Sequence, residues 1–161
     1  MKNKILSVNI KPKPNTNIRD ICEEDSTETV KDKKKYPFEL LNDVDIFVVT
    51  SDYYFLFKIE KGYKWNGADI PKGLFFVGQS KDNNYLHASM VHDYMLEFKE
   101  KIFKDVLREK ISIKEYRRLT SLIFRQILKD EKTNVIKANI MSWCVDIFQA
   151  YGNKKQWECL K

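Results

Sequence analysis

Two runs of strand-forming residues separated by a short polar segment constrain the fold of this chain more than any other feature. Within DVDIFVVTSDYYFLFKIEKGYKW, residues 43–65, both runs are rich in Val, Ile, Phe and Tyr, and Thr50-Ser51-Asp52 separates them. This pattern predicts a β-hairpin. Because side chains alternate across a strand, the second run would present Tyr53, Phe55, Phe57 and Ile59 on one face and Tyr54, Leu56 and Lys58 on the other.

The periodicity changes from that of strands to that of helices beyond residue 83. A first helix is predicted from about Asn84 to Arg108. A second begins at Ser112, because Ser112 and Glu115 have the spacing of a capping box, in which each side chain bonds the backbone N–H of the other residue. The residues of these two helices that are predicted to face the core are Leu86, Met90, Val91, Tyr94, Tyr116, Leu119, Ile123 and Ile127.

A third helix is predicted between Thr133, which can cap its N-terminus, and Gly152, which ends it. Its strongest apolar stripe repeats at intervals of four and three residues, a spacing that places all members on one face of a helix. We expect this face to belong to the core. The stripe consists of Ile136, Ile140, Trp143, Ile147 and Tyr151.

The chain has 161 residues, 43% of them hydrophobic, which is enough to bury one core. We therefore predict one α+β domain over residues 36–161, in which a β-hairpin or small antiparallel sheet packs on about three α-helices. Residues 1–35 are predicted to form an extended N-terminal arm, because the segment from Lys11 to Lys35 is highly charged and has few apolar residues to bury. We expect a partner subunit to order this arm through Lys11, Lys13, Arg19, Lys33, Lys34 and Lys35.

Composition argues against several classes of protein. The 29 Lys and Arg residues are interleaved with 23 Asp and Glu residues, unlike the concentrated basic face of a dedicated nucleic-acid binder, so nucleic acid is not the favoured partner. The cysteines Cys22, Cys144 and Cys159 are odd in number and never form a CxxC pair, which favours reduced thiols over a disulfide scaffold or a zinc site. Neither a membrane span nor a signal peptide is recognisable.

The two histidines are unsuited to a shared metal site. His87 and His92 are five residues apart on the first predicted helix. At roughly 100° per residue, their side chains point about 140° away from each other. One helix therefore cannot direct both imidazoles at one ion, and we expect no bound metal from this pair.

A glycine-containing loop and the helix after it carry a family resemblance. The loop GYKWNGADIP supplies Gly62, Trp65, Asn66, Gly67, Ala68, Asp69, Ile70 and Pro71, and the helix supplies Ala88, His92, Asp93 and Tyr94, followed by Arg117 or Arg118 and by Phe124. In the order and spacing of these residues, roughly from Pro37 to Trp157, the chain resembles domain-of-unknown-function family 1353, which is common in phages and prophages. The resemblance implies a phage or prophage origin.

The loop and the His-Asp pair permit a catalytic interpretation. In a metal-assisted hydrolase of lipid or cell-wall bonds, His92 would activate water, Asp93 would bind Ca²⁺ and the loop would supply carbonyl ligands. Asp69 is the only other carboxylate in the motif that could join such a site. Where the family usually has Asp-Gly-Ala-Ser, this chain has Asn66-Gly67-Ala68-Asp69, and Thr120-Ser121 replaces a usual Ala-Asp pair. These losses of carboxylate favour a non-enzymatic protein without a cofactor.

The same residues also fit an architectural latch. His92 or Asp93 would bond backbone groups of the loop that burial would otherwise leave unpaired. In this interpretation Gly67 permits a positive φ or a close approach, and Pro71 fixes the exit of the loop. The latch residues are Trp65, Asn66, Gly67, Asp69 and Pro71.

From these observations we expect a phage structural or assembly protein that is made in the host cytoplasm and then enters the virion. Its partners would be other virion proteins in an oligomeric assembly, docked through the N-terminal arm. The hydrolase is one alternative. The other is a phage protein that binds and blocks a host factor.

Overall fold

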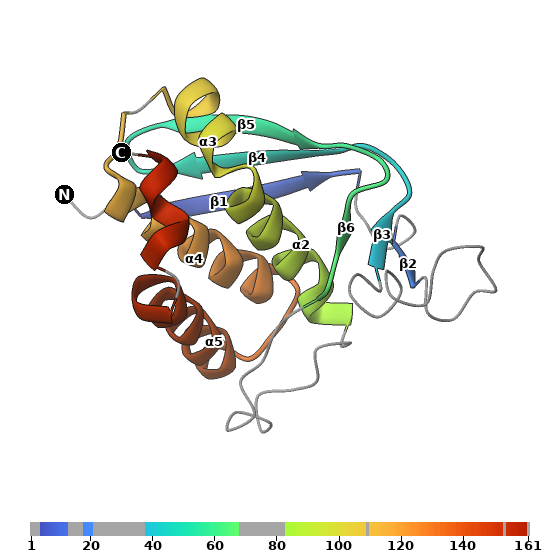
Figure 1. The fold of residues 1–161 in the computed structure, drawn as a ribbon. Coiled ribbons are helices and arrows are strands. Elements are labelled where there is room, and N and C mark those ends of the chain that lie inside the picture. Colours follow the sequence, from blue (N-terminus) through green and yellow to red (C-terminus); the bar gives the residue numbers. More distant parts are fainter. Residues whose placement is uncertain are drawn as a thin grey trace.

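A computed structural model describes residues 4–12, 18–20, 38–67, 83–108, 110–152 and 154–160. It shows the predicted α+β fold (Figure 1). The main sheet is antiparallel with the order β1-β4-β5, formed by β1 (Ile5–Lys11), β4 (Val44–Thr50) and β5 (Tyr54–Ile59). A smaller antiparallel sheet has the order β2-β3-β6, formed by β2 (Ile18–Asp20), β3 (Phe38–Leu40) and β6 (Lys64–Trp65).

The predicted hairpin is confirmed as β4 and β5. In its turn the Thr50 hydroxyl donates to the Tyr53 carbonyl at 2.7 Å and accepts from the Tyr53 and Asp52 amides. The assigned faces are also confirmed, because Phe55, Phe57 and Ile59 are buried whereas the intervening Tyr54, Leu56 and Lys58 are exposed.

The helical part contains more breaks than the sequence indicated. In place of one helix over 84–108, α2 (Asn83–Glu97) ends before Phe98 and is followed by α3 (Lys99–Lys101) and the π-helix η3 (Ile102–Val106). Next come α4 (Ile113–Asp130) and α5 (Val135–Ile147), then the π-helix η4 (Phe148–Gly152) and the 3₁₀-helix η5 (Lys154–Leu160). No helix in the described ranges is long and apolar enough to cross a bilayer.

The predicted capping box at the start of α4 is present. The Ser112 side chain accepts from the Glu115 amide, and the Glu115 carboxylate accepts from the Ser112 amide at 2.8 Å. The predicted cap of α5 is wrong, because Asn134 occupies the cap position instead of Thr133. The Asn134 side-chain oxygen accepts from the amides of Ile136 and Lys137.

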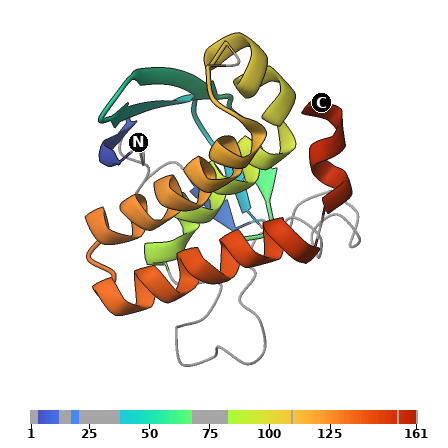
Figure 2. The same ribbon diagram turned by 90° about the vertical axis from the view of Figure 1, so that its left-hand side faces the viewer.

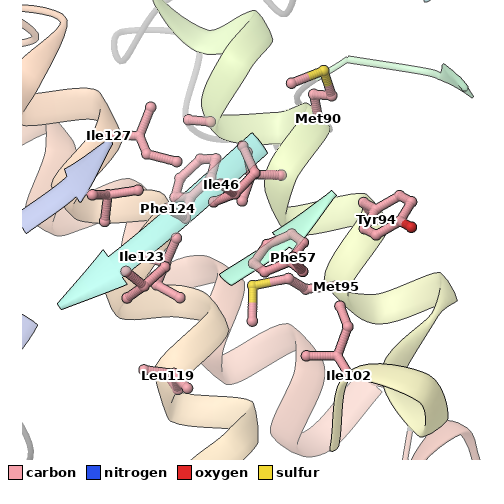
Figure 3. Close-up of a cluster of buried hydrophobic side chains, with 14 of the residues drawn as sticks. Ile46, Phe57, Met90, Tyr94, Met95, Ile102, Leu119, Ile123, Phe124 and Ile127 are labelled. Carbon is pink, nitrogen blue, oxygen red and sulfur yellow. The ribbon is translucent and has the colours of Figure 1, made fainter. Parts of the chain in front are cut away.

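The core lies between the inner face of the main sheet and the helices α2 and α4 (Figure 3). All eight residues predicted to face the core from the first two helices are buried there. They meet Ile46 of β4 and Phe57 of β5, and Phe57 stacks on Tyr94 of α2 with ring centroids 6.0 Å apart. Figures 1 and 2 together show three layers, with α4 between the sheet and α5.

The prediction that the strongest apolar stripe of the third helix faces the core is wrong. Ile136 is 68% exposed and Trp143 is 65% exposed, while Ile147 is 37% exposed and Ile140 is half-buried. The face of α5 that packs on α4 instead carries Ala138, Met141, Ser142 and the half-buried Val145. Tyr151 lies outside the residues whose side chains the structure describes.

The extent of the predicted N-terminal arm also needs correction. Residues 5–11 were assigned to an arm over 1–35 that precedes the domain, but they form β1 and pair with β4 along the edge of the main sheet. Ile18–Asp20 pairs with β3. These strands are not predictable from local composition, because each depends on a partner more than a dozen residues away. Residues 13–17 and 21–37 lie outside the described ranges.

Candidate functional site

The described part of the glycine-containing loop is held against α2 by aromatic side chains. Tyr63 stacks on Trp65 with ring centroids 6.2 Å apart and meets Tyr94 of α2 edge-on at 5.1 Å. Trp65 is buried and also contacts Phe38 of β3 at 5.7 Å. The contact of Tyr63, just before β6, with Tyr94 places the described part of the loop motif beside the helix that carries His92 and Asp93.

Two glycines shape the entry and exit of β6. Gly62 has a φ of +85°, and its amide donates to the Leu40 carbonyl at 2.7 Å. Gly67 has a φ of +83° and is buried, in agreement with the positive φ expected at this position. A side chain at either position would strain the backbone, because L residues other than glycine rarely adopt this conformation.

His92 contacts chain atoms through both ring nitrogens. Its Nδ1 lies 3.2 Å from the Asp93 carboxylate, and its Nε2 lies 2.5 Å from the side-chain nitrogen of Gln149 in η4. An amide nitrogen donates, so Nε2 accepts and the proton on Nδ1 is directed at Asp93. Phe124 of α4 packs edge-on against the imidazole with a centroid distance of 5.6 Å.

Gln149 connects His92 to two further elements. Its side-chain oxygen lies 3.2 Å from the Thr120 hydroxyl of α4, and its carbonyl accepts from the Trp157 indole of η5 at 3.2 Å. Gln149 is only 1% exposed and Thr120 is fully buried. The four groups therefore form a buried polar network that joins α2, α4, η4 and η5.

Asp93 has a different environment from His92. Its side chain is 30% exposed, and it lies close enough to Tyr63 to affect ionisation of the phenol. Burial is the main cause that raises the pKa of the Tyr63 hydroxyl, and the carboxylates of Asp93 and Glu97 raise it further. Tyr63 therefore remains a hydrogen-bond donor throughout the neutral range.

His87 serves a separate contact. It is buried, and its Nδ1 pairs with the carboxylate of Glu131 at the C-terminal end of α4. The two histidines thus contact different elements of the chain. Within the described ranges, no group of three or more His, Cys, Asp or Glu side chains is arranged to hold a metal.

The structure describes only some of the residues that the sequence analysis nominated. Trp65 is buried and Asn66 is exposed, whereas Asp69 and Pro71 fall outside the described ranges. The predicted bonds between His92 or Asp93 and the loop backbone therefore remain a prediction. Among the candidate partner-binding residues, Lys11 is exposed at the end of β1 and Arg19 belongs to β2, while Lys13, Lys33, Lys34 and Lys35 are not described.

The sequence analysis missed Gln149 because this residue follows His92 by 57 positions and lies outside the motif. A signal was nevertheless present. Ala138, Ser142, Val145 and Gln149 repeat at the same four-three-four spacing as the apolar stripe that was chosen. A glutamine that continues a stripe of small residues is a candidate for a buried hydrogen bond.

Residues 39–145, about two thirds of the chain, match the model of a family described as protein of unknown function (DUF1353). No curated protein and no solved structure matches the chain.

Proposed function

The chain belongs to the DUF1353 family, and we propose that it is a non-enzymatic phage structural or assembly protein that binds neighbouring subunits of the virion. In this proposal the protein is made in the host cytoplasm and is then incorporated into the particle. The His-Asp pair stabilises the fold and performs no reaction.

The engagement of both nitrogens of His92 is the observation that carries this proposal. A general base needs one ring nitrogen directed at water or substrate. Here Nδ1 meets Asp93, and Nε2 meets Gln149, which is nearly inaccessible to solvent. An amide side chain cannot act as the nucleophile of a catalytic triad. The contacts therefore support a structural role for His92.

The replaced carboxylates support the same role. Thr120 and Ser121, which stand where the family resemblance leads us to expect an Ala-Asp pair, are buried, and the Ser121 carbonyl accepts from the Ser142 hydroxyl of α5 at 2.8 Å. This position therefore serves the contact between α4 and α5. A hydrolase would instead need a second carboxylate near His92, in addition to Asp93, and access for substrate.

The proposed docking segment is residues 21–35, between β2 and β3. Deletion of the whole predicted arm is a poor test, because it would also remove β1, which pairs with β4 through six residue positions of its register. A better variant replaces residues 21–35 with a short Gly-Ser linker and keeps both flanking strands. This change leaves the main sheet intact and tests the segment alone.

The experiment is carried out in a phage that encodes this chain. We expect mass spectrometry of purified particles to detect the wild-type protein and to show loss of the linker variant, which should remain folded in the lysate. His92→Gln should be incorporated in proportion to its folded amount. The proposal fails if particles lack the protein while His92→Gln abolishes a lipid- or cell-wall-degrading activity of the purified chain.

A further inference from the structure

α5 presents an apolar stripe to solvent as well as to the core. Ile136 and Trp143 are about two thirds exposed, Ile147 is partly exposed, and the half-buried Ile140 lies between them in the four-three-four spacing. The stripe spans about 17 Å at 1.5 Å per residue. Val135 and Phe148 extend the exposed apolar surface at the two ends of the helix. A helix that is apolar on both faces is usually buried on both faces. We therefore expect another surface to cover the exposed face of α5.

The main sheet presents a second exposed apolar surface. On its outer face Phe47 of β4 is the cross-strand partner of Leu56 of β5, and the Phe47 ring lies 6.0 Å from that of Tyr54. Tyr54 is 74% exposed and Leu56 is 55% exposed. Leu6, at the register shift of β1 opposite the end of β4, is also exposed. We call Leu6, Phe47, Tyr54 and Leu56 the sheet patch. We call Ile136, Ile140, Trp143 and Ile147 the helix stripe.

The two surfaces lie on opposite sides of the molecule. The inner face of the sheet packs on α2 and α4, and α5 packs on the far side of α4 (Figures 1 and 2). The described residues therefore cover each outer layer on one side only. A sheet and an apolar helix face are each stabilised by burial against another layer, and a helix on a sheet is one of the few stable solutions.

We propose that copies of this chain associate head to tail, with the helix stripe of one copy packed on the sheet patch of the next. The partner is a second copy because the chain itself supplies both complementary surfaces, and one repeated contact covers both. A symmetric contact between two helix stripes would leave every sheet patch exposed. A head-to-tail contact generates rings or filaments. This inference rests on the proposed function, in which the protein binds neighbouring subunits, and it identifies such a subunit as a copy of the same chain.

The size of the surfaces indicates a weak contact between free copies. Each patch has four apolar side chains that are only partly exposed, and at roughly 100 Å² for each of them a patch supplies about 400 Å². A standard stable interface buries about 800 Å² per partner. We therefore expect association of purified protein at roughly micromolar concentrations. A particle that holds many copies close together would strengthen it through high effective concentration.

Sedimentation velocity of three purified proteins over a wide range of concentrations tests the inference. Wild type should form a concentration-dependent series of species larger than dimers. Trp143→Lys removes the helix stripe and Tyr54→Lys removes the sheet patch, and each variant alone should associate at least about tenfold more weakly. An equimolar mixture of the two should form a dimer and stop there, because only one intact pair of surfaces remains. Both replaced side chains are largely exposed, so the monomers should stay folded.

Asp105→Lys is the control for added surface charge, since Asp105 is exposed in η3 and belongs to neither patch. It should associate like wild type. The inference is overturned if wild type stays monomeric, or if Tyr54→Lys still associates while Trp143→Lys does not, which would indicate a symmetric contact through α5. It is also overturned if neither variant changes association. Because these measurements use pure protein, they fail or succeed independently of whether the chain is found in particles.

Discussion

The residues on the two faces of α5 repeat at the same spacing, but one face is buried and the other is largely exposed. Ala138, Ser142, Val145 and Gln149 face the rest of the molecule, whereas most of the helix stripe is exposed. The more apolar set is the one left outside. The comparison teaches that a four-three-four spacing identifies the helix but does not decide which face is buried.

Side-chain size and hydrogen bonding explain the choice of face. Ala138 is fully buried, and small residues of this kind let α5 approach α4 closely. The Ser142 hydroxyl donates to the Ser121 carbonyl at 2.8 Å, and Gln149 meets both His92 and Thr120. A Trp143 side chain turned inward would have to displace these contacts. The inner face is therefore selected by fit and by polar partners, and hydrophobicity alone would select the other face.

The largest expected effect comes from truncating one side chain on each face of α5. Met141→Ala should lower the free energy of unfolding by about 2 to 4 kcal/mol, because Met141 is buried and truncation leaves a cavity. Trp143→Ala, two residues away, should change it by less than about 0.5 kcal/mol. Denaturant titration of dilute, monomeric protein measures both. Equal losses would mean that both faces of α5 are buried, and a larger loss for Trp143→Ala would mean that α5 buries the opposite face.

A second test removes the polar partner on the inner face. Gln149→Leu should cost about 1 to 3 kcal/mol, because His92 Nε2 loses a buried partner and the Thr120 hydroxyl loses its contact with the side-chain oxygen. The matched control is Gln126→Leu, which breaks only an exposed bond to Asp130. It should change stability by less than about 0.5 kcal/mol. Similar losses of stability in the two variants would show that the polar network does not select the buried face of α5. Nitrogen-15 NMR of His92 in Gln149→Leu would show separately whether the proton on Nδ1 is retained.

Most local features of this fold were predictable from sequence. The hairpin, its two faces and the capping box at Ser112 depend on residues only a few positions apart. The core faces of α2 and α4 followed from a single clear stripe in each helix. In α5 two stripes compete, and the spacing gave no means to choose between them.

The features that were not predicted depend on distant partners. β1 needs β4, which lies more than thirty positions along the chain. His92 was nominated as a site residue from the motif, but its partner Gln149 comes from an element that carries no part of the motif. The local sequence shows which hydrogen bonds a side chain is able to form, but the fold determines which partner lies close enough to form them.

The smallest expected effect concerns the cap that begins α5 and helps to fix which stripe faces α4. Asn134→Ala should cost about 1 kcal/mol, because the Asn134 side chain accepts from two amides of the first turn. Thr133→Val should be close to neutral, since the buried Thr133 hydroxyl has no hydrogen-bond partner in the part of the chain that the structure describes. Urea titrations of both variants, with helix content followed by circular dichroism, would compare the two positions directly. If Thr133→Val lowers stability more than Asn134→Ala does, Thr133 is the cap of α5. The Asn134 cap would then not help to fix the orientation of α5.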